Sequence, residues 1–167
     1  MKKLSLSLII LISTINLIFA QKSTDYEQLC REVSELLVAN NKTDFVKRFC
    51  PTKEDLFELS YGSKANKVKK KERVGFYETI GPTLGMLEEN ISSSFDFVYG
   101  KMGKNKILKI DNVDIQKSTK TKIEELEVQN FFFVVSDGQN QFNLELLGVF
   151  RSSRDWVILT DIAPWNF

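Results

Sequence analysis

The stretch of the chain that decides the fold is Leu126–Ile162, LEVQNFFFVVSDGQNQFNLELLGVFRSSRDWVILTDI. It consists of three apolar runs separated by two short polar segments, Asp137–Gly138 and Ser152–Arg154. Turns favour such residues because glycine adopts the positive φ that closes a hairpin, and aspartate or serine hydrogen-bonds to the nearby backbone. The pattern therefore predicts three antiparallel strands joined by two tight turns.

The pairing of these strands is predicted from burial. If Ser136 faces Asn140 across a three-residue loop, Phe132 lies opposite Leu144 and nearly all side chains on that face are apolar. Because side chains alternate along a strand, a shift by one residue would mix polar and apolar residues on both faces. We therefore expect the even-numbered side chains from Leu126 onward to point into the core.

The same register predicts a pocket between the sheet and a long helix. Its apolar lining is Phe132, Leu144, Leu146 and Trp156. Asn130 is the lone polar residue on this face. It is either a core amide with satisfied hydrogen bonds or a polar group of the pocket, and we favour the first.

The opposite face of the predicted sheet is mixed, and four apolar residues gather at one end of it: Leu147, Val149, Val157 and Leu159. A sheet that is covered on one side only should alternate cleanly along each strand. We therefore expect these four residues to be covered. The covering group is another segment of the chain, a twofold-related copy or a ligand. A homodimer formed through these four residues is one prediction.

Residues 1–20 have the pattern of a secretory signal peptide. The basic start is followed by the 16-residue run Leu4–Phe19, in which 11 residues are aliphatic or aromatic, and Ala20 then precedes the polar Gln21. This run is shorter than the ~20 residues of a membrane-spanning helix, and no later run is long enough. We expect cleavage of the signal peptide and a secreted or periplasmic protein without a membrane span.

The remaining chain has the size of one domain, which we expect over residues 24–163. Removing 20 of 167 residues leaves 147, enough for a proper core. Without Lys2 and Lys3, 21 basic residues face 22 acidic ones, so the net charge of the mature chain is −1. A balance of this kind implies neither nucleic acid nor an anionic membrane as partner.

Helical periodicity fills the region before residue 104. Caps are predicted at Thr24, Thr43 and Thr52, and one helix is predicted over Ser63–Ile80. The clearest pattern starts at Pro82, with apolar residues at positions 84, 87, 91, 95, 98 and 102. A strand over Ile107–Gln116 with a bulge near Asp111–Asn112, and a polar connection over Lys117–Glu125, are expected to lead to the three-stranded segment.

Two smaller features allow alternative interpretations. The basic run Lys67–Arg73 is either a binding surface or a solvated helix face, and we favour the solvated face because no aromatic residues interleave the bases. Cys30 and Cys50 are expected on antiparallel helices about the turn at Asn40–Lys42. Export makes a disulfide plausible, and we favour it over two buried thiols.

The order of elements resembles a known superfamily. Helices, then a long helix, then an antiparallel meander resemble the cystatin-like α+β cone of the nuclear transport factor 2-like superfamily. The closest resemblance is to small exported bacterial members, through the segments Phe142–Leu146 (FNLEL) and Asp155–Leu159 (DWVIL), and it spans most of residues 24–163. The resemblance implies a pocket between helix and curved sheet, dimers through the sheet, and functions from isomerase or dehydratase to ligand carrier or interaction module.

Catalytic residues are sparse. The chain has no histidine, which removes the commonest general base and metal ligand, and we expect no metal and no cofactor. The predicted register places Glu145 opposite Asp161 with Phe131 across from it, and two close carboxylates beside a ring could share one proton. On a solvated face the same pair has no role, and this is the interpretation that we favour.

Two functional hypotheses follow from these observations. The first is an exported, non-catalytic binding or interaction module that holds a small apolar ligand or a protein partner. The alternative is a small lyase or isomerase that works through pocket carboxylates and Tyr77 or Tyr99.

Overall fold

The computed structural model describes residues 25–123 and 126–165, without the side chains of residues 121–127. The predicted signal peptide and the predicted cap at Thr24 lie outside the described residues. In the described part, helices precede a four-stranded antiparallel sheet with the order β1-β2-β3-β4. The predicted α+β class, with a long helix packed against an antiparallel sheet, is confirmed.

The helices are the N-terminal helix (residues 25–38), α2 (Lys42–Phe49), α3 (Lys53–Tyr61), the 3-10 helix η1 (Gly62–Lys67), α4 (Lys70–Thr79) and α5 (Gly81–Lys104). The strands are β1 (Asn112–Ile123), β2 (Leu126–Ser136), β3 (Gln141–Arg151) and β4 (Trp156–Pro164). Among the described residues, no helix has the length and apolar character needed to cross a bilayer.

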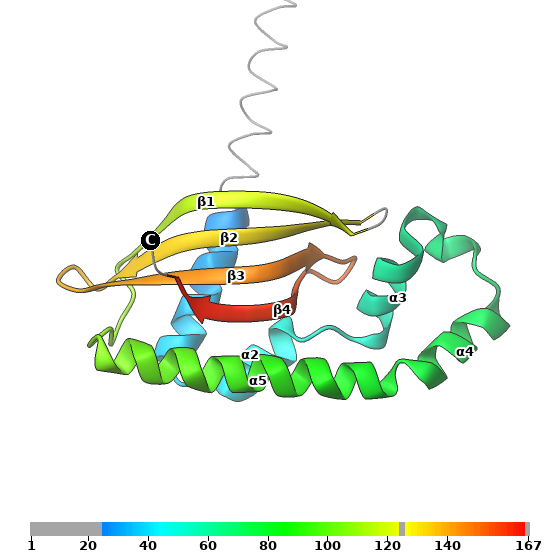
Figure 1. Cartoon of the computed structure of the whole chain (residues 1–167), viewed down its shortest axis with the longest axis horizontal. Helices are drawn as coiled ribbons and strands as arrows, with labels where there is room; N and C mark the ends of the chain where they lie inside the picture. The colour runs from blue at the N-terminus through cyan, green and yellow to red at the C-terminus, as the bar shows by residue number, and fades with distance from the viewer. Residues whose placement is uncertain (1–24, 124–125, 166–167) are drawn as a thin grey trace, which may run out of the picture.

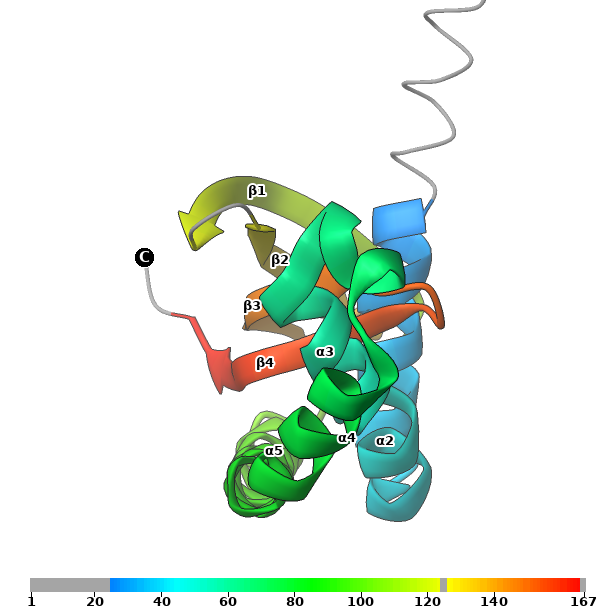
Figure 2. The ribbon, with the colours of Figure 1, turned by 90° about the vertical axis from the view of Figure 1, so that its right-hand side faces the viewer.

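The main core lies between the sheet, the N-terminal helix, α2 and α5. Figure 1 shows α5 running beside β4, and Figure 2 shows the N-terminal helix and α2 along one face of the sheet. Fully buried aromatic side chains from these elements fill the space between them: Phe45, Phe49, Phe95, Phe131 and Phe133. Burial of this apolar surface is the dominant stabilising term of the fold.

Only part of the apolar stripe predicted for the long helix is buried. Ile91, Phe95 and Val98 are buried, but Leu84 and Leu87 are half-buried. Figure 1 shows the reason: the first turns of α5 extend past the start of β4.

Helix boundaries follow capping chemistry. The helix start predicted at Thr52 is confirmed: Thr52 and Asp55 form a capping box, in which each bonds to the other's backbone N–H, and Gly62 ends the helix. The predicted cap at Thr43 is wrong, since Asn41 caps α2. The single helix predicted over Ser63–Ile80 is also wrong: extended backbone at Val68 separates η1 from α4.

The first hairpin has a four-residue loop rather than the predicted three-residue one. Ser136 pairs with Gln141. The Asp137 carboxylate accepts a hydrogen bond of 2.7 Å from the backbone N–H of Asn140, and Gly138 adopts a φ of +87°. One extra loop residue shifts the pairing by one position and exchanges the faces of one strand.

The strand whose two faces are exchanged relative to the prediction is β2. Phe133 pairs with Leu144, and Phe132 pairs with Glu145. The prediction that even-numbered side chains point inward is therefore wrong for the centre of β2, where Phe131, Phe133 and Val135 are buried instead. It holds for the buried residues Leu144, Leu146, Trp156, Ile158 and Ile162 of β3 and β4.

A bulge at Gly148 reverses the phase of β3. Gly148 has a φ of +65°, and its backbone N–H donates a 2.8 Å hydrogen bond to Oδ1 of Asn130. Past the bulge, Val149 enters the core in place of Phe150. A side chain at position 148 would overlap with Thr160, whose Cβ lies 3.1 Å from the position that a Cβ would take.

Strand β1 begins and ends later than predicted. It covers Asn112–Ile123, so the segment from Lys117 that was expected as a connection is a strand, and the bulge lies at Gln116. The lysine, serine and threonine residues in the second half of β1 are compatible with a strand, because β1 lies at the edge of the sheet, where polar side chains are common.

The segment from α3 to residue 90 of α5 forms an arm with an aromatic cluster of its own. The ring of Phe57 lies 4.5 Å from that of Tyr61 and 5.4 Å from that of Phe76. The guanidinium of Arg73 lies 4.5 Å from the Phe57 ring centre, and its Nε donates to the Tyr77 hydroxyl at 2.9 Å. Phe57 is fully buried but lies outside the main core.

Candidate functional site

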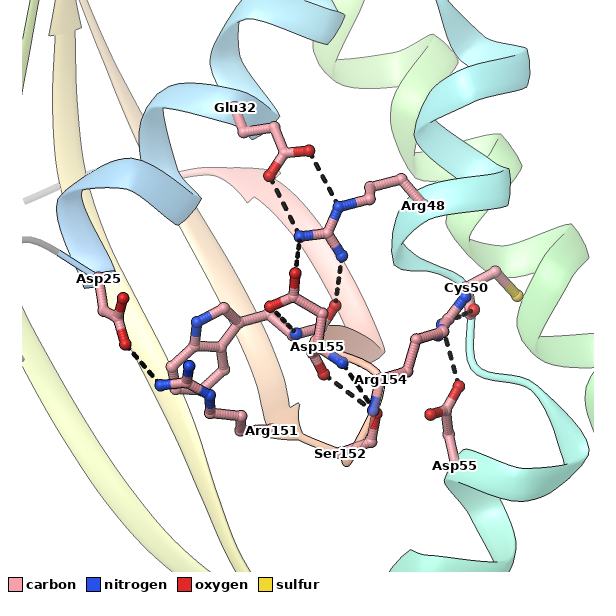
Figure 3. Close-up of polar contacts among 10 residues, drawn as sticks. Asp25, Glu32, Arg48, Cys50, Asp55, Arg151, Ser152, Arg154 and Asp155 are labelled. Atoms are coloured by element: carbon pink, nitrogen blue, oxygen red, sulfur yellow. Dashed lines mark hydrogen bonds and ion pairs between the residues drawn. The ribbon is translucent and has the colours of Figure 1, made fainter.

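The first groove lies where the turn between β3 and β4 meets the N-terminal helix and α2 (Figure 3). We call it the charged groove. It encloses about 530 Å³, and its lining residues are Glu32, Leu36, Asp44, Lys47, Arg48, Arg154 and Asp155.

Arg48 joins three separate segments at this groove. Its Nε donates to Glu32 at 2.9 Å, and one terminal nitrogen donates to Asp155 at 2.6 Å. The other donates to the backbone carbonyl of Trp156 at 3.3 Å. The planar guanidinium suits this arrangement because its donors are fixed in a fork.

Arg154 forms the second junction of the groove, with α3. Its guanidinium lies 2.9 Å from the carboxylate of Asp55, which is 2% exposed, and donates to the carbonyl of Cys50 at 3.0 Å. Burial alone would raise the pKa of Asp55. Hydrogen bonds from Ser152 and Thr52 and the charge of Arg154 outweigh this effect and hold the pKa below its ordinary value.

The charges of this groove compensate one another. Arg48 faces two carboxylates, Arg154 faces one, and Arg151 beside them pairs with Asp25 at 2.5 Å. A ligand would have to displace these bonds. The charged groove is therefore best understood as a junction that fastens the turn to three helices.

A second groove lies between the C-terminal half of α5 and the ends of β3 and β4. We call it the aromatic groove. It encloses about 500 Å³, and its lining residues are Phe97, Lys101, Asn105, Gln141, Phe142, Asn143, Ala163, Pro164 and Trp165.

Aromatic rings and amides dominate the aromatic groove. Phe97 is 56% exposed, and Nζ of Lys101 lies 5.2 Å from its ring centre. The backbone N–H of Trp165 donates to the carbonyl of Asn143 at 3.0 Å, which holds Trp165 against β3. Apolar side chains that line one hollow together, as Phe97, Pro164 and Trp165 do, are a feature of binding sites.

The polar side chains of the aromatic groove form fewer hydrogen bonds within the protein than those of the charged groove. The side chains of Gln141 and Asn143 have no hydrogen-bond partner among the residues that the structure describes. The Asn105 amide donates to the carbonyl of Lys101 at 2.8 Å. Amide donors and acceptors beside exposed rings allow a ligand to be both held and oriented.

The five residues of the predicted internal pocket do not meet in one cavity. Leu144, Leu146 and Trp156 are buried in the main core, whereas Phe132 lies on the opposite face, 5.0 Å from the Trp165 ring. Asn130 is a satisfied amide whose oxygen binds Gly148. The shift in the register of β2 is the physical reason for this separation.

The four residues of the predicted dimer surface do not share an exposed face. Val149 and Val157 are fully buried within the single chain, and Leu147 and Leu159 are half-buried. Dimerisation itself stays a prediction.

The carboxylate pair is displaced by the same shift in register. Glu145 pairs with Ala163, and Asp161 pairs with Leu147, so the predicted direct pairing is wrong. Partial burial, and then the charge of Asp161, still raise the pKa of Glu145. Neither carboxylate lines either groove, and neither do Tyr77 and Tyr99.

The residues of the aromatic groove are not among the predicted site residues, although the sequence contains one signal for them. Phe97 lies outside the apolar stripe of its helix, and an aromatic residue at such a position is expected to face solvent. Trp165 follows Pro164 after the last predicted strand. Only the folded structure brings the two residues to one groove.

The predicted disulfide is absent, since Cys30 and Cys50 are both free. Cys30 points into the main core, whereas Cys50 ends α2 as its C-terminal cap and is only half-buried. The expectation assumed that two cysteines at similar distances from a helical turn face each other, and spacing alone does not determine side-chain direction.

Burial also predicts the reactivity of the two thiols. It raises the pKa of Cys30 well above its ordinary range and that of Cys50 to about 11. We therefore expect negligible alkylation of the folded protein by iodoacetamide at pH 8, because the thiolate is the nucleophile. Unfolding without a reductant should release two titratable thiols per chain, and a titre of zero would contradict this prediction.

Comparison with models of protein families, with curated proteins and with solved structures finds no match for this chain.

Proposed function

We propose that this protein is an exported binding module without a catalytic role, and that the aromatic groove is its binding site. The observation that carries the proposal is the 56% exposure of Phe97 in a groove of about 500 Å³. Export rests on the sequence pattern of residues 1–20.

The chemistry of the groove defines the class of ligand. Phe97 and Trp165 supply apolar ring surface, and Lys101 supplies a positive charge at the same place. Gln141 and Asn143 add amide groups. An amphipathic ligand with an apolar body and an acidic or amide head matches this combination.

The order of helices and strands supports membership of the nuclear transport factor 2-like superfamily as a further part of the proposal. Within this fold we place the binding site in the aromatic groove, because buried side chains fill the space between the helix and the sheet where an internal pocket was expected.

The test uses anilinonaphthalene sulfonate, a fluorescent probe with an aromatic body and an acidic head. We expect the wild-type protein to enhance its fluorescence saturably, and Phe97→Ser to weaken binding about tenfold, because stacking on an aromatic side chain is lost. Lys101→Gln should weaken binding by a smaller factor. Titration of fluorescence measures both effects.

The matched control is Met86→Ser, which removes a 65% exposed apolar side chain from the same helix outside the groove. It should leave probe binding unchanged. Equal binding by Phe97→Ser and wild type, or equal losses in Phe97→Ser and Met86→Ser, would contradict the proposed site.

A further inference from the structure

Positive charge is concentrated on the arm, although the net charge of the whole chain is close to zero. Six basic residues and one acidic residue lie between Lys64 and Arg73, which gives +5, whereas the whole chain has a net charge of +1. The rest of the chain therefore carries −4. A near-neutral total excludes an anionic partner only if the charges are mixed evenly, and they are not.

The lysines of this segment face solvent. The side chains of all five are exposed: Lys64, Lys67, Lys69, Lys70 and Lys71. Among the described residues, the last four have no carboxylate within ion-pair distance. Arg73 is different, because it is half-buried against the Phe57 ring and belongs to the scaffold of the arm.

The arm presents these lysines away from the body of the protein. Figure 1 shows α4 beyond the ends of the strands, and α4 has no buried residue. Helical spacing places Arg73, Phe76 and Tyr77 on its inner face. Lys71 and Val74, three positions apart, lie on the outer face, and Lys70 is exposed in the first turn of the helix.

Exposed apolar side chains accompany the charge. Val74 is 46% exposed, and Met86, on the part of α5 that belongs to the arm, is 65% exposed. Lysines together with apolar side chains are the combination that binds the interface of an anionic bilayer.

We propose that the arm docks on the surface of an anionic lipid bilayer. Single-stranded nucleic acid fits less well, because the arm's aromatic side chains are buried or half-buried in its own cluster and cannot stack on bases. In the mature chain, whose net charge is −1, the remainder carries −6, and this charge would keep the body, with the aromatic groove at the other end of α5, away from the same surface. This inference is independent of the proposed ligand.

The experiment is co-sedimentation of the mature protein with vesicles of phosphatidylcholine containing 30% phosphatidylglycerol at low salt. Each lysine close to such a surface contributes about fivefold to the binding constant. The triple variant Lys69→Gln, Lys70→Gln, Lys71→Gln should therefore bind about a hundredfold more weakly. Glutamine preserves helix propensity, and an unchanged circular dichroism spectrum verifies folding.

The matched control removes the same charge outside the arm, through Lys47→Gln, Lys104→Gln and Lys106→Gln, three exposed lysines, and should lose no more than about threefold. Binding of the wild type should disappear at 0.5 M salt and with pure phosphatidylcholine. Equal losses in the two triple variants, or the absence of vesicle binding, would overturn the proposal. Tighter binding to duplex DNA than to the vesicles at the same salt would also overturn it.

Discussion

Replacing Gly148 with alanine is expected to lower the free energy of unfolding by about 2 to 4 kcal/mol. Two costs combine at this position. Its φ of +65° is unfavourable for any residue with a Cβ, by about 1 to 3 kcal/mol. The new methyl group would in addition overlap with Thr160 on the neighbouring strand. Urea denaturation measures the loss.

Gly100→Ala is the matched control for this substitution. Gly100 lies within α5 with ordinary helical backbone, and a Cβ there would meet no atom within 4 Å. The control should stabilise the protein by about 0.5 to 1 kcal/mol, because alanine loses less conformational entropy than glycine in a helix. Effects of the same sign and size in the two variants would show that the bulge is not the cause.

Replacing Asp55 with alanine is expected to cost about 2 to 4 kcal/mol of unfolding free energy. The change removes half of the capping box of α3, in which Asp55 accepts from the backbone N–H of Thr52 at 2.8 Å. It also removes the partner of the buried Ser152 hydroxyl and of the half-exposed Arg154 guanidinium, and a buried polar group left without a partner is costly.

Asp44→Ala provides the control because Asp44 occupies the same third position in α2 and also bonds to its capping residue, Asn41. This pair is exposed, and no arginine of the described residues forms an ion pair with Asp44. Its loss should cost no more than about 1 kcal/mol. Similar losses in the two variants would contradict the role assigned to burial and to Arg154.

The effect of Asp55 should also depend on pH. Its pKa is lowered in the folded chain, so the carboxylate adds stability above the unfolded pKa of about 3.9. That contribution is lost as the pH falls through the folded pKa. The difference in unfolding free energy between wild type and Asp55→Ala should therefore be constant near neutral pH and shrink below about pH 4.

The register of β2 could not be predicted from the sequence. Residues 131–135 are apolar without interruption, so alternation in β2 cannot say which of its faces is buried. The phase depended on the length of one loop. The hydrogen bonds of Asp137 select four loop residues, and this single difference moves Phe132 from the expected pocket to the opposite face.

Local patterns were reliable where a side chain acts on its own backbone or on one helix face. The helix start at Thr52 and the buried positions Ile91, Phe95, Val98 and Met102 of α5 belong to this class. The grooves belong to another class. Phe97 and Trp165 are 68 positions apart in the sequence and meet only because α5 packs along β4.

The sequence by itself determined the α+β class, the strand order of a meander and the helix that packs against it, because hydrophobic periodicity and turn residues act over a few neighbouring positions. The tertiary structure alone decided the register, the bulge at Gly148 and the location of the grooves. These features depend on contacts between distant segments, and a difference of one residue in a loop is enough to change them.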